Sequence, residues 1–314
     1  MIGSRAQQID DKLLVSILLP PPTFLSMRTK LDGKLISMIF SFRTSTLITS
    51  LALLPFSKSY IFKNIHTTRL VMSASSTEIN THLSDIINNF NEVKQEVDAS
   101  VVLANRDPTL TKLVAVSKTK PVEDIRALYD IGHRHFGENY FQELTEKCKL
   151  LPTDINWHFI GHLQSSKAAK LIKEVPNLYV VETVDTLKLA TKLNNACEAI
   201  KRAKLDIYIQ VHTSDEETKS GVAPDALNEL VECIIRDCPH LHIAGLMTIG
   251  APDDYTCFDK LAQCRVQIAD FTNRPIESFQ LSMGMSGDFE EAIARGATSV
   301  RVGSTIFGAR NYNK

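Results

Sequence analysis

The chain has 314 residues, of which 44% are hydrophobic and 23% are charged, and its formal net charge is -1. This composition is typical of a globular protein with a large core, and the balanced charge argues against nucleic acid as a partner. None of the six cysteines forms a C-x-x-C pair with another: Cys148, Cys197, Cys233, Cys238, Cys257 and Cys264. This pattern predicts free thiols in a reducing compartment and no metal site.

The N-terminal quarter differs from the rest in composition. Residues 38–71 contain no acidic residue but several basic, serine and threonine residues, as mitochondrial presequences do. The apolar patch LITSLALLPF within them is too short to span a bilayer. The alternative is an extension upstream of a start at Met72. In both cases we expect residues 1–75 to be a poorly ordered extension or presequence. We expect the protein to be cytoplasmic, and also mitochondrial if the segment directs import. We expect no membrane attachment.

A regular pattern of helices and strands begins near residue 76. Apolar residues in the segment 76–97 recur at the spacing of one helical face. Eight short apolar runs follow, with amphipathic stretches between them: 113–118, 135–139, 156–161, 178–184, 206–213, 242–249, 279–285 and 299–308. Eight β/α units within residues 76–314 predict a single α/β domain, a closed (β/α)8 barrel of the TIM type. An open doubly wound sheet is the alternative, but its Gly-rich first turn is missing.

Polar residues of unusual type follow the predicted strands. In a (β/α)8 barrel the residues at the carboxyl ends of the strands converge at one mouth, where the active site lies. We therefore expect one site formed by Lys118, Asn139, Met247, Ser282, Ser286, Arg301, Gly303 and Ser304. His158 and His162 are four residues apart, a spacing that presents two metal ligands only on a helix, and this segment is predicted as strand and loop. We expect no metal at this site.

Lys118 ends the first predicted strand, in the segment TKLVAVSKTKP. Strand alternation places it on the same side as Val114 and Val116, which we expect to be buried. A buried amine without a counter-charge loses its proton readily, and the neutral amine attacks aldehydes. The alternative is a lysine whose side chain extends past the end of the strand into water.

The loops after the seventh and eighth strands have the small residues and hydroxyl groups of a phosphate site. In barrels of this kind phosphate binds at these two loops, which here read SMGMSGDFEEA and RVGSTIFG. We expect Ser286 or Gly287 to cap a helix over residues 288–295, whose free N–H groups would face the phosphate. These features together indicate a ligand with both an aldehyde and a phosphate, and pyridoxal 5'-phosphate (PLP) has both.

Several motifs, in the order AVSKTKP, FGENYFQE, WHFIGHLQSSK, GLMTIG, LSMGMSGDFEEAI and VRVGSTIFGAR, closely resemble the pyridoxal phosphate homeostasis protein family. The resemblance covers residues 79–312. It implies a barrel like the N-terminal domain of alanine racemase, the fold type III of PLP proteins. Two positions depart from the family's usual pattern, because Ser166 stands where asparagine is usual and Ser304 where threonine is usual. Ser304 keeps the hydroxyl group that a phosphate would need.

The resemblance also implies roles for the residues of the mouth. Lys118 would form a Schiff base with PLP, and Arg301 would face the pyridine nitrogen. The phosphate would be held by Ser286, Gly303 and Ser304, with Ser282 as a further candidate. Asn139 is a candidate near the ring, although an asparagine before a helix is commonly a cap.

The same site is compatible with a carrier or an enzyme. Because arginine keeps its proton, Arg301 would leave the ring nitrogen unprotonated, which makes the ring a poor electron sink. A racemase of this barrel type, as the resemblance implies, adds a C-terminal β domain that we do not expect here. We therefore expect a monomeric carrier or buffer in PLP homeostasis, with little or no turnover, that serves apo PLP-dependent enzymes. The alternatives are a PLP-dependent amino-acid racemase and a barrel enzyme that binds a sugar phosphate through its lysine.

Overall fold

The computed structural model describes residues 24–31, 34–41, 58–214, 220–251 and 253–309, with side chains from residue 80 onward. The chain divides into two compact units, Met1–Leu70 and Val71–Lys314. In the first unit, strands β1 (Phe24–Leu31) and β2 (Lys34–Ser41) pair in antiparallel fashion. That residues 1–75 are a poorly ordered extension or presequence stays a prediction.

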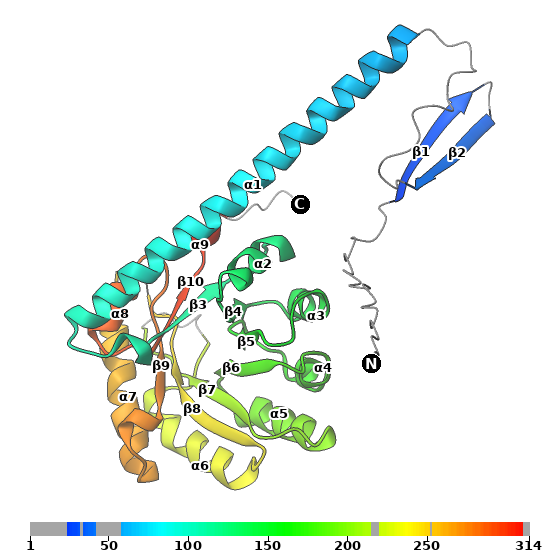
Figure 1. The fold of residues 1–314 in the computed structure, drawn as a ribbon. Coiled ribbons are helices and arrows are strands. Elements are labelled where there is room, and N and C mark those ends of the chain that lie inside the picture. Colours follow the sequence, from blue (N-terminus) through cyan, green and yellow to red (C-terminus); the bar gives the residue numbers. More distant parts are fainter. Residues whose placement is uncertain (1–23, 32–33, 42–57, 215–219, 252, 310–314) are drawn as a thin grey trace, which may run out of the picture. The chain divides into compact units, whose positions relative to one another are not determined.

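The described part of the second unit contains a closed barrel of eight parallel strands (Figure 1). The strands are neighbours in chain order, and the last pairs with the first to close the barrel. Their bounds are β3 (Lys112–Val116), β4 (His135–Glu138), β5 (Asn156–Phe159), β6 (Leu178–Val184), β7 (Leu205–Gln210), β8 (Leu241–Met247), β9 (Gln280–Ser282) and β10 (Ser299–Val302). Each predicted apolar run overlaps one of these strands, so the predicted (β/α)8 barrel is confirmed.

Helices follow the strands of the barrel and surround it (Figure 1). Helix α6 illustrates why they pack there, because its buried residues Leu227, Leu230, Val231 and Ile234 recur at the spacing of one helical face. The bounds are α2 (Val122–Asp130), α3 (Phe141–Leu150), α4 (Ala168–Glu174), α5 (Leu187–Ala199), α6 (Leu227–Asp237), α7 (Thr256–Thr272), α8 (Phe289–Ala294) and α9 (Ser304–Phe307).

Helix α1 (Lys58–Leu103) precedes the barrel. It contains the predicted helical segment 76–97 and extends beyond it at both ends, since no glycine or proline interrupts residues 58–103. Its side chains Ile86, Phe90 and Val93 are buried in the main hydrophobic core, at the spacing of one helical face.

Strand β3 determines which side chains point into the barrel. Leu113 and Ala115 belong to the main core, which includes the apolar faces of the helices. Val114 and Val116 alternate with them and pack against Gly137, where a Cβ atom would lie 3.1 Å and 3.4 Å from their methyl groups. A side chain at Gly137 would therefore displace the valines of β3 on the inner side, from which the chain continues to Lys118.

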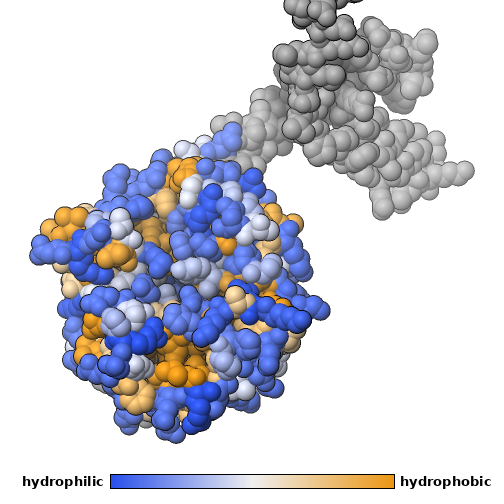
Figure 2. All heavy atoms as spheres, turned by 60° about the horizontal axis from the view of Figure 1, so that its bottom comes forward, coloured by the Kyte–Doolittle hydropathy of each residue, from blue (hydrophilic) through white to orange (hydrophobic). Residues whose placement is uncertain are grey.

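One face of the barrel unit shows how apolar side chains are distributed among polar ones. Figure 2 shows a face of the barrel unit that is mostly hydrophilic, with separate apolar areas between charged and polar residues. In the part of the chain that the structure describes, no helix is long and apolar enough to cross a membrane.

Candidate functional site

A cavity of about 230 Å³ lies at the carboxyl ends of strands β3 and β10. The residues that line it come from β3 and β10 and the segments after them, from the loop after β9 and, in the case of Ile160, from the end of β5. Five of the eight predicted site residues are among them: Lys118, Ser286, Arg301, Gly303 and Ser304. The structure thus brings together residues that are up to 186 positions apart in the sequence, as the barrel topology predicts.

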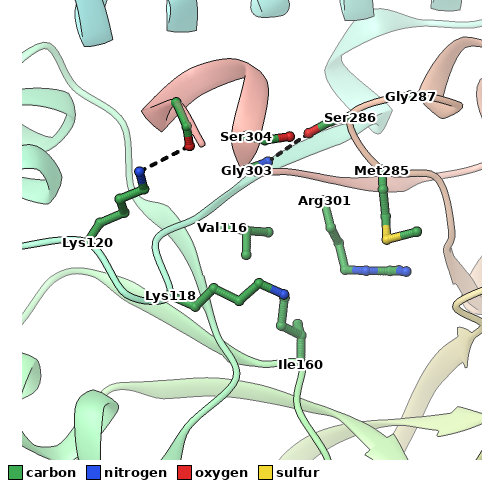
Figure 3. A pocket seen from close by; sticks show the side chains of 11 residues that line it. Val116, Lys118, Lys120, Ile160, Met285, Ser286, Gly287, Arg301, Gly303 and Ser304 are labelled. Carbon is green, nitrogen blue, oxygen red and sulfur yellow. Dashed lines mark hydrogen bonds between the residues drawn. The ribbon is translucent and has the colours of Figure 1, made fainter. Parts of the chain in front are cut away.

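The two lysines of the cavity point in different directions (Figure 3). Lys118 extends across the cavity toward Ile160 and Arg301. Lys120 is turned toward helix α9, where its Nζ donates to the carbonyl oxygens of Phe307 at 2.7 Å, of Gly308 at 3.0 Å and of Ala309 at 2.9 Å. All three protons of the Lys120 ammonium group are therefore engaged, and Lys118 is the lysine directed across the cavity.

Opposite Lys118, small residues form a cup of hydroxyl and backbone N–H groups (Figure 3). The hydroxyl oxygen of Ser286 accepts a hydrogen bond from the Gly303 N–H at 3.2 Å. A Cβ atom at Gly303 would lie 3.2 Å from both the Cβ atom and the carbonyl oxygen of Val116, so a side chain there would crowd the floor of the cavity. Ser304 begins helix α9 beside this glycine.

The residue that caps helix α8 differs from the prediction. Asp288, not Ser286 or Gly287, is the N-cap residue, and its carboxylate accepts a hydrogen bond from the Met285 N–H at 2.5 Å. The Asp288 side chain makes no hydrogen bond to the first N–H groups of α8, since it accepts from the loop that precedes the helix. The hydroxyl of Ser286 is thereby left for the cup around Gly303.

Arg301 lies on β10, and only 4% of its surface is exposed. Its two terminal nitrogens donate to the hydroxyl of Ser282 at 2.6 Å and to the carbonyl oxygen of Thr248 at 2.8 Å. Burial lowers the pKa of Arg301, against the opposing charge of Glu182. An arginine nevertheless keeps its proton in a protein, so the cavity has a fixed cation in one wall.

A buried carboxylate supports Arg301 from within the barrel. Glu182 on β6 accepts a hydrogen bond from Ser282 at 2.5 Å and contacts Nδ1 of His158 at 2.6 Å. Burial alone would raise the pKa of Glu182, but the hydrogen bond and charge of His158, together with Arg301 and Ser282, hold that pKa below its ordinary value. Sequence reasoning did not single out Glu182, although an acidic residue in the apolar run LYVVETV was a usable signal.

Three predicted site residues lie away from the wall of this cavity. Ser282 is fully buried behind Arg301. Met247 is 1% exposed and packs with Val180, Tyr208 and Ala244 in a small cluster of its own. Asn139 lines a neighbouring pocket of the mouth together with His162. Any effect of Ser282 on a ligand in the cavity would thus pass through Arg301.

The cavity contains few groups that could transfer a proton. Among the described residues that line it, the titratable side chains are Lys118, Lys120 and Arg301. The other lining residues are apolar or carry hydroxyl groups, and they include Val116, Ile160 and Met285. The site therefore offers cations, hydroxyls and N–H groups, a donor set suited to an anionic ligand.

Comparison with known proteins assigns the chain to a family. Residues 82–311 match the model of the alanine racemase N-terminal domain. The pyridoxal phosphate homeostasis protein of Schizosaccharomyces pombe is 48% identical over 208 residues, which cover 64% of this chain and 85% of that protein. The human pyridoxal phosphate homeostasis protein is 43% identical over 240 residues, or 71% of this chain and 86% of that protein. The chain belongs to the pyridoxal phosphate homeostasis protein family.

A solved structure of similar fold carries the family's ligand. PipY of Synechococcus elongatus, in a structure with PLP bound, is 32% identical and matches with a TM-score of 0.56, covering 68% of this chain and all of PipY. The family resemblance inferred from the sequence motifs of the mouth is thus confirmed. In this member of the pyridoxal phosphate homeostasis protein family, the motifs AVSKTKP, WHFIGHLQSSK, LSMGMSGDFEEAI and VRVGSTIFGAR contribute residues to the cavity wall, whereas FGENYFQE and GLMTIG do not.

Proposed function

We propose that this chain binds PLP through a Schiff base on Lys118 and acts in intracellular PLP homeostasis as a carrier or buffer with little or no turnover. The observation that carries the proposal is one cavity with Lys118 directed across it and a hydroxyl and N–H cup opposite. The names of the relatives and the PLP bound to PipY support it.

Lys118 would make the covalent contact with the aldehyde. The neutral amine bonds to the aldehyde carbon, and the aldehyde oxygen leaves as water with the two amine protons, so that a C=N bond remains. Val116, Ile160 and Met285 are the apolar side chains among the described residues that line the cavity. Lys120 is the less suitable nucleophile, because three carbonyl oxygens accept its three protons.

The cup around Gly303 fits a phosphate group. Ser286 uses an oxygen lone pair for the Gly303 N–H, which leaves its own proton to donate to an anion. Gly303 lies so close to Val116 that a side chain at position 303 would crowd the cavity, so the absence of a side chain there leaves room for a ligand. Ser304 adds a hydroxyl at the start of α9. We propose that the phosphate lies against Ser286, Gly303 and Ser304, with the two serines as hydroxyl donors and Gly303, whose N–H binds Ser286, leaving the space.

Arg301 would restrict the chemistry of the bound cofactor. PLP enzymes use the protonated pyridine ring as an electron sink. A guanidinium group that keeps its proton, held in place by Ser282 and Thr248, would leave a ring nitrogen beside it unprotonated. The ring would then stabilise a carbanion poorly, which favours the role of carrier over that of catalyst.

The proton-transfer groups around the cavity also favour a carrier. A racemase needs one group to remove a proton and a second group on the opposite face to return it. Among the described lining residues, Lys118 could serve one face once an amino acid replaced it on the cofactor, whereas the protons of Lys120 are held by the end of helix α9. An amino-acid racemase is the second candidate function, since the fold is that of the alanine racemase N-terminal domain. Apo PLP-dependent enzymes as recipients, the monomeric state and the cytoplasmic or mitochondrial location remain parts of the proposal.

Borohydride reduction tests the proposal directly. We expect the purified protein mixed with PLP to gain the absorbance of a Schiff base, and borohydride to fix PLP on a peptide that contains Lys118. The variant Lys118→Ala should lose both signals and keep its circular dichroism spectrum, whereas Lys173→Ala, an exposed lysine of α4, should keep both. Attachment at another lysine in the wild-type protein would refute the assignment.

A further inference from the structure

The loop that carries Lys118 has a strained backbone. Thr119, directly after Lys118, has φ = 63°, in the left-handed region that residues other than glycine seldom adopt. Threonine is branched at Cβ, which makes this conformation more unfavourable still. Because Thr119 is exposed, burial of its side chain does not compensate the strain. Contacts of the loop must hold this conformation in place.

The loop is closed by a backbone hydrogen bond from the Lys120 N–H to the Ser117 carbonyl oxygen at 3.1 Å, and helix α3 supplies further contacts. The carboxylate of Glu143 accepts a hydrogen bond from the Thr119 N–H at 2.6 Å. Lys147, one helical turn later, donates to the carbonyl oxygen of Ser117 at 2.7 Å and to Glu143 at 2.6 Å. Both flanking residues of Lys118 are therefore held through their backbone atoms by two side chains of a single helix.

A second carboxylate completes the cluster. Glu138, the last residue of β4, accepts hydrogen bonds from Lys147 at 2.7 Å and from the hydroxyl of Ser117 at 2.6 Å. The three protons of the Lys147 ammonium group are thus shared among two carboxylates and the Ser117 carbonyl. The side chains of Lys147 and Glu138 are 6% and 0% exposed. Charges so deeply buried are costly unless they are paired; here Oε1 of Glu138 accepts both hydrogen bonds, while Oε2 is buried without a partner.

The direction of these contacts separates two explanations. A cluster that only attached helix α3 to the barrel could contact any part of β3 or β4. This cluster instead contacts the backbone of Ser117 and Thr119, the residues on either side of Lys118, and one of its contacts is made at the strained residue. The geometry therefore relates the cluster to the placement of the lysine.

We infer that Glu143 and Lys147 are positioning residues for Lys118: they hold the Ser117–Lys120 loop in its strained form, which directs the Lys118 side chain across the cavity. The inference rests on the proposed function in that Lys118 is taken as the PLP-binding lysine. Loss of the Glu143 contact should let Thr119 relax, so that fewer molecules present Lys118 correctly. Relief of the strain at Thr119 should remove the need for Glu143.

The first measurement is the rate of Schiff-base formation after mixing with PLP. Leaving the left-handed conformation relieves roughly 1–2 kcal/mol, so Glu143→Ala should react about five- to thirtyfold more slowly than wild type. Glu143→Gln keeps an oxygen acceptor for the Thr119 N–H and should retain most of the rate. The matched control is Glu146→Ala, because Glu146 is an exposed residue of the same helix, and its rate should equal that of wild type.

The second measurement restores the loop by a different route. Glycine adopts φ = 63° without strain, so the change Thr119→Gly should recover much of the rate that Glu143→Ala loses. If Glu143→Ala alone does not fold, the double variant is compared with Thr119→Gly alone, and nearly equal rates are expected. Unequal rates in that pair, or no recovery in the folded variant, would contradict the inference.

The third measurement does not involve PLP. Brief treatment of the protein with acetic anhydride, followed by peptide mass spectrometry, reports the relative reactivity of each lysine. Lys118 should change its reactivity in Glu143→Ala but not in Glu146→Ala, while that of Lys173 stays the same in all variants. If wild type forms no adduct on Lys118, the proposed function fails. If wild type forms it but Glu143→Ala matches wild type in rate and labelling, only the positioning role fails.

Discussion

Arg301 and Ser282 are joined by a 2.6 Å hydrogen bond in the interior of the barrel, and the same hydroxyl donates to Glu182 at 2.5 Å. One serine hydroxyl thus links a buried guanidinium to a buried carboxylate. Each charge has a second partner, which is the Thr248 carbonyl for Arg301 and His158 for Glu182. Ser282 therefore supports the cavity from behind, whereas Ser286 faces into it.

Removal of the Ser282 hydroxyl should destabilise the fold. Ser282→Ala leaves a guanidinium nitrogen and a carboxylate oxygen buried with one partner fewer, at a cost of about 1–3 kcal/mol. We expect urea denaturation to show a correspondingly lower free energy of unfolding. Ser286→Ala is the control, since its hydroxyl lies at the cavity surface and its loss should leave stability nearly unchanged. Equal stability of Ser282→Ala and wild type would show that the link carries little energy.

For phosphate recognition, we expect the loss of the Ser286 hydroxyl to matter more than the loss of the Ser282 hydroxyl. A hydrogen bond to a charged group contributes about 1.5–3 kcal/mol, and a single neutral donor somewhat less, so Ser286→Ala should weaken PLP binding by about 1–2 kcal/mol. That loss corresponds to a Kd about five- to thirtyfold higher. Pyridoxal, which has no phosphate, is the matched ligand control and should bind wild type and Ser286→Ala equally weakly. If pyridoxal bound as tightly as PLP, the phosphate cup would be misplaced.

Glu138 should make stability depend on pH near neutrality. Burial raises the pKa of Glu138 to about 7, against the opposing charge of Lys147. Its pKa in the unfolded chain is about 4.3. A raised pKa in the folded state adds stability that is full below the unfolded value and is lost as the pH rises toward 7. At most about 4 kcal/mol is involved, since the two pKa values differ by about 2.7 and one pKa unit corresponds to about 1.36 kcal/mol.

The variant Glu138→Gln isolates this effect. It keeps an oxygen acceptor for Lys147 but cannot ionise, so wild type should lose stability relative to the variant between about pH 4.5 and pH 7. His133 and His135, whose pKa values burial lowers to about 4 and about 3, have the opposite dependence in both proteins and cancel in the comparison. Denaturant unfolding at a series of pH values gives the difference, and parallel curves would argue against a titration of Glu138 in this range.

The barrel could be predicted because its signals are local. Alternation in Leu113–Val116 and the recurring apolar runs follow from the period of a strand, and barrel topology then places strand ends together. How deeply each residue is buried in the mouth of the barrel could not be predicted in the same way. Ser282 and Ser286 are four residues apart in one loop motif, but β9 ends at Ser282, which keeps that residue inside the barrel.

Other contacts of the site could not be predicted because the partners lie far apart in the sequence. Lys120 contacts carbonyl oxygens 187 to 189 residues later in the chain, and no local pattern marks such a pair. Glu143 and Lys147 have the i, i+4 spacing of any exposed helical ion pair, so the sequence alone gave no reason to place them beside Lys118. The predicted capping of α8 by Ser286 or Gly287 was wrong because Asp288, one or two residues later, caps the helix.

The carrier proposal predicts that the PLP-loaded protein does not exchange the α-proton of amino acids. Exchange requires a base beside the α-carbon and a ring that accepts the electron pair. An amino acid that replaced Lys118 on the cofactor would release this lysine, which could then act as a base on one face. For the opposite face the described lining residues offer Lys120, whose protons are held by three carbonyl oxygens. Arg301 would leave the ring nitrogen unprotonated, so the ring would be a poor electron sink. The described lining residues therefore supply a base for one face only, beside a ring that would accept the electron pair poorly, so we expect little exchange.

Incubation of the loaded protein with L-amino acids in deuterated water measures this exchange by mass spectrometry and optical rotation. We expect rates far below those of ordinary enzymes, which are roughly 1–1000 per second. An apo PLP-dependent enzyme added to the same sample should gain activity as it takes up the cofactor, with free PLP at equal concentration as the control. Rapid exchange that disappears in Lys118→Ala would instead establish the racemase alternative, because the fold supports that chemistry wherever a second base is supplied.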